Sequence, residues 1–573
     1  THPDNDYIGD MLKNSSMKQQ YNLTVRGGTP FVRYYVSANY LNEQGIFNTF
    51  DNENYDSNVY FKRYGMRTNL DFNVTKTTVF GVDLSGRLEE RHDNDAGTDL
   101  YKSMVRLPPN YLNYVNPNGT YGGKLNVVNP YAALSKYGYN HSKRNVFEAV
   151  VKLNQKLDFI TKGLSARAMF GFVSTMASRR DITERPELWE YTKDGQYAIV
   201  SNETPVRIDT SAGPHRRNIT TEFAVNYERK FGAHAVTGLL AFNQLNQHYN
   251  AVLPTGYINY VGRVTYGYKN RYLAEFNAGY NGSVQFAEGK RYGFFPAFSL
   301  GWVVSEEKFW GKSNKVFNYM KIRGAYGEVG NDQIGGGRRF PYLTLINFGG
   351  GSRWGSNGLT EKQIGANNLH WEVAKKYNLG IDFQFLNDKI GGTVDIFRDT
   401  RDNIFPERKM MPSEVGVVTN PYTNVGRMRS SGIDGNIYLN QKINEDNSFT
   451  VRANMTYAVS KVVHWDQDAV RYPYQSYSDV NYGVMRGLVA LGLFQNQDEI
   501  NRSPKQTYGE VRPGDIRYKD VNADGKIDDD DIVPIAHSNV PQIQYGFALE
   551  YRYKRWTISA LFTGAAKVNF LYG

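Results

Sequence analysis

The chain of 573 residues contains no cysteine. It can therefore form neither a disulfide framework nor a zinc–thiolate site, and it has no thiol nucleophile. It also has no run approaching the roughly 18 to 20 consecutive apolar residues of a spanning helix, which excludes a helical membrane protein. A membrane β-barrel stays open, because alternate residues face a polar interior and keep the mean hydropathy, here −0.56, low.

Dense basic runs are missing too, although the net charge is +10. Scattered Lys and Arg residues indicate a solvated surface, so we expect no nucleic-acid partner. Aromatic residues, by contrast, make up 14% of the chain and include 43 Tyr. A disordered chain has few aromatic residues, so these side chains must be buried or stand at a lipid interface.

Enzyme signatures are absent: the chain has no HExxH, no GxSxG and no Walker loop. The glycines at 335–337 are not followed by Lys-Ser/Thr, so they predict a loop and not a phosphate cradle. Glu184, Glu187 and Glu190 offer carboxylates for glycoside hydrolysis, but a solvated charge cluster explains them better. We expect no enzyme activity and no nucleotide or redox cofactor.

The two ends of the chain suggest cuts through a longer protein. Thr1 is not preceded by Met, and Gly573 closes the apolar-rich stretch 570–573. The absence of a targeting signal therefore says nothing about the compartment.

Apolar and polar residues alternate with a period of two along most of the chain. Between Phe80 and Leu88, apolar residues alternate with polar ones, which predicts a strand with one apolar and one wet face. The same alternation recurs at 272–280, 377–384, 449–460 and 545–552. Many segments reach the roughly 9 to 11 residues that a strand needs to cross a bilayer at a tilt.

The connections between these segments alternate between short and long. Short turns are expected at 27–30, 74–77, 158–163, 230–233, 268–271, 386–389, 444–447 and 554. Long connections are expected at 41–57, 93–144, 181–217, 250–260, 331–369, 401–422 and 461–540. A transmembrane barrel, with tight turns on one side and large loops outside, requires this asymmetry, whereas a soluble sandwich does not.

The fold class predicted is therefore all-β, a transmembrane antiparallel β-barrel. The alternation gives about 18 strands, whereas large plugged transporters close with about 22. We expect residues 1–573 to be one partial barrel without its first and last strands, with 461–540 as a long extracellular excursion. Residues 306–310 predict a short helical turn in place of one tight connection. Aromatic residues near the predicted strand ends suit interfacial girdles; they are Tyr272, Trp302, Tyr377, Phe385, Tyr551 and Trp556.

These segments resemble the SusC/RagA family of TonB-dependent outer-membrane transporters. The resemblance covers essentially the whole chain in register and rests on 21–47, 262–310, 321–332, 371–383, 514–531 and 541–563. It implies energised import of a bulky nutrient, an oligosaccharide or a peptide, across the outer membrane of a Gram-negative bacterium. It further implies a SusD-like lipoprotein lid, outer-membrane lipid around the barrel, and TonB acting through a plug domain. The TonB box and plug, which precede the barrel in this family, are not found in the chain.

An acidic stretch at 520–531 has the ligand spacing of a calcium-binding loop. Oxygen ligands stand at loop positions 1, 3, 5, 7, 9 and 12, supplied by Asp520, Asn522, Asp524, the Lys526 carbonyl, Asp528 and Asp531. Gly525 suits the sharp turn, while Asp531 stands where such loops use Glu. We expect a structural Ca²⁺ here, against the alternative of a solvated acidic loop.

Aromatic and polar residues crowd into the long connections, where they suit sugars, peptides or a partner protein equally well. The candidate substrate- or partner-binding residues are Tyr111, Tyr114, Tyr121, Arg338, Arg339, Trp354, Trp465, Tyr472, Tyr474 and Tyr477. Packing of loop on loop is the competing explanation. On the polar face of the strands, residues expected to face the lumen are Asp83, Arg87, Glu275, Arg323, Asp382 and Arg452.

Two other functions remain open from the sequence. A soluble, calcium-binding, all-β carbohydrate-binding protein or hydrolase would explain the acidic loop and the aromatics, but not the alternating connections. A passive porin or adhesin barrel would explain the strands without a plug.

Overall fold

The computed structural model describes residues 3–50, 58–192, 194–250, 252–311, 316–334, 339–348, 358–409, 413–417 and 419–571. The predicted residues Arg338 and Trp354 lie outside these ranges. The chain divides into two compact units, Thr1–Val225 with Phe242–Gly256, and Asn226–Ala241 with Tyr257–Gly573. We call them unit 1 and unit 2 and describe each by itself.

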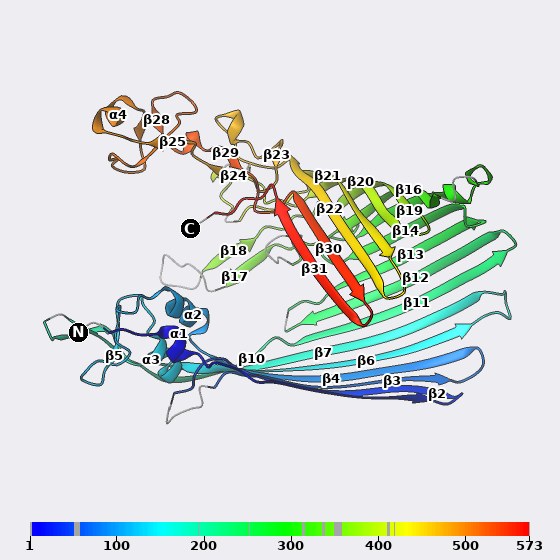
Figure 1. The fold of residues 1–573 in the computed structure, drawn as a ribbon, viewed down its shortest axis with the longest axis horizontal. Helices are drawn as coiled ribbons and strands as arrows, with labels where there is room; N and C mark the ends of the chain where they lie inside the picture. Colours follow the sequence, from blue (N-terminus) through cyan, green and yellow to red (C-terminus); the bar gives the residue numbers. More distant parts are fainter. Residues whose placement is uncertain are drawn as a thin grey trace. The chain divides into compact units, whose positions relative to one another are not determined.

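Long antiparallel strands make up most of unit 1 (Figure 1). They are β1 (Lys18–Gly28), β2 (Val32–Gln44), β3 (Tyr60–Asn73), β4 (Thr78–Asn94), β6 (Gly138–Lys156), β7 (Leu164–Arg185) and β10 (Thr204–Ala212). Each of β1 to β4, β6 and β7 pairs antiparallel with the next in that order, and β10 pairs with β7. β11 (Arg216–Phe231), β12 (His234–Tyr249) and β13 (Thr255–Tyr268) contribute residues to both units.

A helical cluster is built from the segment before β1 and from the long connections of unit 1 (Figure 1). Its elements are α1 (Tyr7–Met11), α2 (Gly97–Arg106) and α3 (Pro130–Lys136), with the short strands β5 (Tyr121–Gly122), β8 (Leu188–Tyr191) and β9 (Tyr197–Ser201). Met11, Leu100 and Leu134 are each 1% exposed at its centre. Asn129 caps α3 by accepting from the backbone N–H groups of Tyr131 and Ala132 at 3.0 and 3.2 Å. The cluster therefore has a core of its own, built from loop residues.

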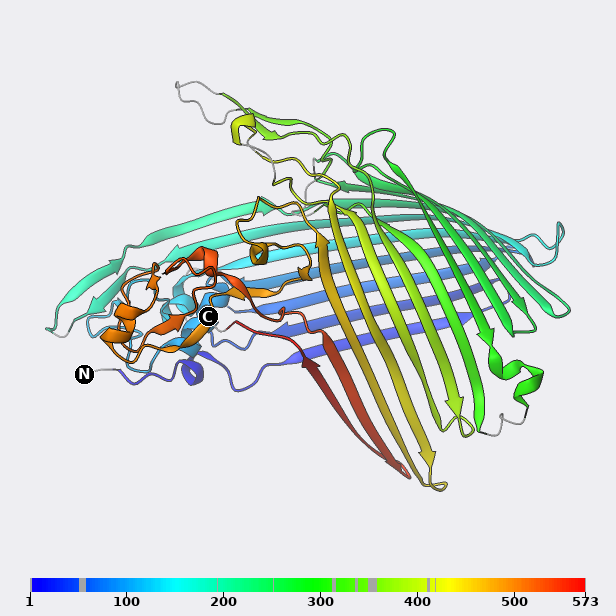
Figure 2. The same cartoon turned by 90° about the horizontal axis from the view of Figure 1, so that it is seen from above.

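Unit 2 carries a second run of long antiparallel strands, which lie side by side in Figure 2. They are β13 (Thr255–Tyr268), β14 (Tyr272–Ser283), β15 (Tyr292–Val303), β16 (Phe317–Asn331), β19 (Glu372–Phe385), β20 (Ile390–Ile404), β21 (Gly426–Lys442), β22 (Asn447–His464), β30 (Ile543–Tyr553) and β31 (Trp556–Ala566). Each pairs antiparallel with the next in that order.

Shorter elements occupy the connections of unit 2. They are the 3₁₀ turns η1 (Val304–Glu306), η2 (Lys308–Trp310), η5 (Ser413–Val415), η6 (Pro473–Gln475) and η7 (Asp529–Asp531), the helix α4 (Gln497–Arg502), and the strands β17 (Leu345–Phe348), β18 (Leu359–Gln363), β23 (Val480–Asn481), β24 (Met485–Gly487), β25 (Ala490–Leu493), β26 (Lys505–Gln506), β27 (Ile516–Tyr518), β28 (Lys526–Ile527) and β29 (Val533–Ala536). η1 and η2 confirm the predicted helical turn between two strands. A small core packs Phe286, Phe295 and Trp371 together below the longer connections.

The all-β, antiparallel prediction is confirmed. Twenty strands of the described residues join one sheet; 18 of these are 11 to 22 residues long, while β10 and β23 have 9 and 2. The short turns fall where the sequence predicts them: both residues between β30 and β31, Lys554 and Arg555, and all four between β19 and β20, 386–389, are turn residues. None of the helices in the described part of the chain is long and apolar enough to cross a membrane.

Strand ends differ from the sequence-based boundaries in unit 1. β6 begins at Gly138, inside the expected connection 93–144, while β7 extends to Arg185 and β10 lies inside 181–217. All nine residues of β10 are exposed. In β10 the apolar–polar alternation is confined to 206–209, Val-Arg-Ile-Asp, so the sequence pattern marks only a part of this strand.

The faces of the strands follow the predicted alternation. In unit 2, Glu275 stands opposite Ser299, Ser299 opposite Ala325, and Ala325 opposite Asn378, so these residues share one face of the sheet, the polar face. On the other, apolar face, Phe276 stands opposite Phe298, and both rings are exposed. Exposed rings in a row along a sheet are expected where the surrounding solvent is lipid.

Candidate ligand-binding site

A cavity of about 510 Å³ opens among the long connections of unit 1. It is lined by Pro3, Asn110, Tyr111, Leu112, Asn113, Asn116, Gly122, Gly123, Lys124, Trp189, Glu190, Tyr191 and Thr192. Such a volume falls in the usual range of ligand pockets, about 300 to 1,000 Å³. Aromatic faces, amides and one pair of opposite charges therefore meet in one concave place.

The parallel pairing of β5 with β8 builds one wall of this cavity, because it sets Gly122 opposite Trp189. The backbone N–H of Gly123 donates to the Trp189 carbonyl at 3.0 Å. The Asn116 amide donates to the same carbonyl at 2.9 Å. A Cβ at Gly122 would stand 2.0 Å from the Asn113 carbonyl oxygen, so only glycine allows the backbone at 122 to approach Asn113 this closely.

Charged and aromatic side chains are placed in the cavity by contacts among themselves. The Lys124 ammonium lies 4.4 Å from the centre of the Tyr111 ring and 3.9 Å from a Glu190 carboxylate oxygen. The Trp189 indole N–H donates to Glu187 at 2.8 Å, which fixes its ring. Rings with fixed orientation and polar tips can stack on a sugar or on a peptide side chain while amides bond its polar groups.

Of the predicted binding residues in this region, only Tyr111 lines the cavity. Tyr114 and Tyr121 pack against the helical cluster, and the Tyr114 hydroxyl donates to Asp10 at 2.9 Å. Burial, together with this carboxylate, raises the pKa of Tyr114 well above its ordinary value. Lys124, Trp189 and Tyr191 were missed. The aromatic and polar residues at 189–192 were the available signal, but the pairing that joins them to Tyr111 cannot be read from the sequence.

The candidate residues of the excursion 461–540 fall in a different place, in unit 2. The Tyr472 and Tyr474 rings stack with centres 5.3 Å apart, and the Tyr474 hydroxyl donates to the Asp530 carbonyl at 2.7 Å. Arg486 lies 4.8 Å from the centre of the Tyr477 ring. Trp465 lies against Gly426, and Arg339 lies over the Phe340 ring at 5.7 Å. In each case the observed partner is another residue of unit 2.

The carboxylates of the acidic loop 520–531 accept hydrogen bonds from the backbone of the same loop. Asp531, fully buried, accepts from the N–H groups of Val521 and Asp528 at 2.6 and 3.0 Å. Asp520 accepts from Gly525 at 2.9 Å, and Asp524 accepts from Lys526 at 2.9 Å. Across the described residues, no three acidic or histidine side chains are grouped so that they could hold a metal ion. Calcium binding here stays a prediction.

On the polar face of unit 2, charges predicted to face the lumen form a network. Arg323 donates to Asp382 at 3.1 Å and to Asp395 at 2.7 Å. Glu275 pairs with Arg263 at 3.1 Å. The register places Arg452 opposite Tyr438 on the same face. In unit 1, Asp83 bonds Asn69 and Lys152, and Arg87 pairs with Glu89 at 3.1 Å.

A large antiparallel sheet with one polar face and one exposed apolar face is typical of membrane β-barrels. No protein-family model matches the chain. TonB-dependent receptor P39 of Formosa agariphila is 25% identical over 628 residues, which cover 97% of this chain and 57% of that protein. TonB-dependent receptor P3 of the same organism is 24% identical, covering 94% and 56%. The TonB-dependent receptor SusC of Bacteroides thetaiotaomicron is 23% identical, covering 78% and 47%.

Among solved structures, the RagAB peptide transporter superposes with a TM-score of 0.73 at 18% identity, covering 99% of this chain and 63% of that one. Its open-open state gives a TM-score of 0.74. The chain spans about half the length of the curated relatives it matches. Over nearly its whole length the chain is therefore similar to the barrel region of TonB-dependent receptors of the SusC/RagA kind, and its fold is that of an outer-membrane β-barrel of Gram-negative bacteria. The prediction that the chain is not an enzyme agrees with this likeness to receptors.

Proposed function

We propose that the chain is the barrel of an importer that carries a bulky nutrient, an oligosaccharide or a peptide, across the outer membrane. The observation that carries this proposal is the likeness to TonB-dependent receptors over 94 to 97% of the chain. The RagAB structures, which are named as those of a peptide transporter, share the fold over 99% of it. The soluble alternative is overturned by the outer-membrane fold.

The polar face of unit 2 carries hydrogen-bonding and charged groups that a plug domain could contact. Paired side chains such as Arg323 with Asp382 and Arg263 with Glu275 offer donors and acceptors to a plug domain or to a passing substrate. We infer that a TonB-energised plug opens the path, since no nucleotide-binding motif is present in the chain. A SusD-like lipoprotein would cover the outer loops and enclose the substrate.

The cavity of unit 1 would make the first contact with substrate. Tyr111 and Trp189 offer ring faces, and Lys124 with Glu190 offers one charge of each sign. Such a set accepts a sugar ring or a peptide with either charge, so the cavity chemistry supports a ligand without choosing between the two classes.

The test is uptake by cells. Deleting the full-length gene should abolish growth on one class of nutrient in a panel of oligosaccharides and peptides, and Tyr111→Ala should reduce that uptake by roughly tenfold. Tyr101→Ala is the matched control, because Tyr101 is exposed on α2 and does not line the cavity. Removing TonB should also abolish uptake. Uptake that persists without TonB would contradict the importer hypothesis and favour a passive porin.

A further inference from the structure

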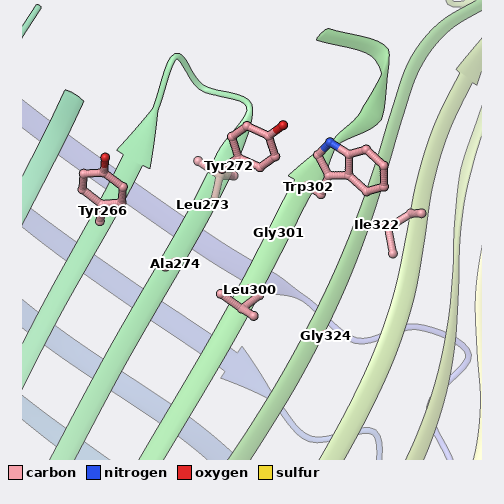
Figure 3. Close-up of a pocket in the computed structure, with 9 residues that line it drawn as sticks. All are labelled: Tyr266, Tyr272, Leu273, Ala274, Leu300, Gly301, Trp302, Ile322 and Gly324. Carbon is pink, nitrogen blue, oxygen red and sulfur yellow. The ribbon is translucent and has the colours of Figure 1, made fainter. Parts of the chain in front are cut away.

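The apolar face of unit 2 contains a hollow of about 520 Å³ near the short-turn ends of β13 to β16 (Figure 3). It is lined by Tyr266, Tyr272, Leu273, Ala274, Leu300, Gly301, Trp302, Ile322 and Gly324. Apart from the tips of its aromatic rings, every lining side chain is apolar. Large exposed side chains such as Phe276, Phe298 and Leu379 stand on the same face beside the hollow, so the open space has a local cause.

The hollow exists because two small residues interrupt the row of large ones. In the register, Ala274 stands opposite Leu300, and Leu300 stands opposite Gly324. Nothing but the Leu379 Cδ1, at 4.0 Å, lies within 4 Å of the position that a Cβ on Gly324 would take. A side chain would therefore fit there without strain, and its absence leaves open space on a lipid-facing surface.

One end of the hollow has a polar rim of fixed side chains. The Tyr272 hydroxyl and the Trp302 indole N–H both donate to a single Glu307 oxygen, the second over 3.1 Å. Arg271 donates to the other Glu307 oxygen at 3.0 Å and balances its charge. Amphipathic rings held in this way mark the level at which hydrocarbon gives way to headgroups.

Two exposed lysines stand beyond this rim. Lys269 lies in the β13–β14 turn, with its ammonium 5.3 Å from the centre of the Tyr268 ring, and Lys308 opens η2. Neither forms an ion pair with another described residue, while Glu306 is the one exposed carboxylate of η1 and η2. With Arg271 balanced by Glu307, the local charge is positive, which complements a phosphate.

We propose that this hollow is a phospholipid site: one acyl chain lies between Leu300 and Ile322 over Gly324, and the phosphate contacts Lys269 and Lys308. A protein partner would have to bury the same surface inside the bilayer, where lipid chains already fill apolar space at no cost. The combination of an apolar trough, an aromatic rim and free cations in that order matches the order of groups along a phospholipid.

The experiment is native mass spectrometry of the whole protein extracted from outer membranes in detergent. We expect one phospholipid to stay bound, and delipidated protein to rebind it from vesicles of phosphatidylglycerol. Gly324→Leu and Ala274→Leu fill the trough and should each reduce retention by roughly tenfold or more. Replacing Lys269 and Lys308 together by Gln should weaken rebinding of phosphatidylglycerol while leaving the trough intact.

Gly262→Leu is the matched control. Gly262 lies on the same apolar face of β13, outside the hollow, with its nearest neighbour atom at 3.7 Å. Equal retention in Gly324→Leu, Ala274→Leu and wild type would overturn the site, as would loss of lipid to the same extent in Gly262→Leu. If the lysine variant binds phosphatidylglycerol as well as the wild type does, the headgroup assignment is overturned. Since none of these measurements uses transport, they can fail while the import proposal stands.

Discussion

The ring of Tyr438 on β21 lies across Gly391 on β20, the residue directly opposite it in the ladder. A Cβ at position 391 would stand 2.3 Å from the Tyr438 hydroxyl oxygen. Gln384 on β19 donates to that hydroxyl at 3.4 Å, so the phenol spans three strands. The same pairing of a glycine with the tyrosine opposite it occurs at Gly27 and Tyr34, Gly282 and Tyr292, and Gly564 and Tyr545.

Gly391→Ala should push the Tyr438 ring off its neighbour strand. Overpacking of this kind typically lowers the free energy of unfolding by about 1 to 3 kcal/mol. Urea unfolding in detergent micelles, followed by tryptophan fluorescence, measures it. Gly86→Ala is the control, because no atom lies within 4 Å of its Cβ position, and its stability should change little. Equal effects at the two glycines would contradict this account of the tyrosine.

Arg323→Met tests how much the charge network on the polar face contributes to the free energy of unfolding. It leaves the Asp395 carboxylate, whose side chain is 10% exposed, without its cation. Removing one partner of a buried pair costs about 3 to 5 kcal/mol, and the 32% exposure of Arg323 places the expected loss at the lower end. The measurement is the same urea titration.

A second substitution checks the cause of that loss. Adding Asp395→Asn to Arg323→Met removes the orphaned charge, so part of the stability should return. If the double variant is as unstable as the sum of the two single variants, the network does not act through this pair.

Much of the fold could be predicted from the sequence, because bilayer-crossing strands must alternate apolar and polar residues. Phe276 and Glu275 show the rule: the first is exposed on the apolar face, and the second is paired with Arg263 on the other. The rule is weaker in β10, where all nine residues are exposed and the alternation is confined to 206–209.

The candidate site was harder to predict, for a physical reason. A two-residue parallel ladder between β5 and β8 joins Trp189 to the segment that follows Tyr111, and such a short long-range pairing leaves no pattern in either strand. Composition also cannot separate a ring that packs inward from one that faces a ligand. Tyr114 and Tyr111 are three residues apart, yet the first bonds Asp10 within the helical cluster and the second lines the cavity.

The Tyr508 hydroxyl gives a prediction on pH. It donates to Asp529 at 2.7 Å, and burial together with that carboxylate raises the pKa of Tyr508 to about 12. An unfolded tyrosine has a pKa near 10. The stabilising contribution of this contact is therefore fully present below pH of about 10 and is lost as the pH rises through about 12.

Spectrophotometric titration of tyrosine ionisation tests this. The difference between wild type and Tyr508→Phe should contain one phenol titrating near pH 12. In Asp529→Asn the same difference should move toward pH of about 10, because the carboxylate is gone. A phenol that titrates identically in both backgrounds would rule the contact out.

Chelation tests the predicted calcium site. If the loop 520–531 binds Ca²⁺, EDTA should lower the melting temperature of the protein, and Asp524→Ala should remove that sensitivity. Asp498→Ala is the control, since Asp498 is an exposed carboxylate on α4 in the same excursion. A melting temperature that is the same with EDTA and with excess Ca²⁺ would show that the backbone bonds of Asp520 and Asp531 hold the loop by themselves.

The two ends of the excursion meet at the rim of the sheet. Its chain leaves β22 and returns on β30, the strand paired with β22, and the N–H of Ala458 donates to the Gln542 carbonyl at 2.8 Å. An insert whose ends are already neighbours can be exchanged for another without shifting the register of either strand. Evolution can thus replace the whole surface module in a single recombination event, and an engineer can graft one from a relative, while the membrane-embedded scaffold stays unchanged.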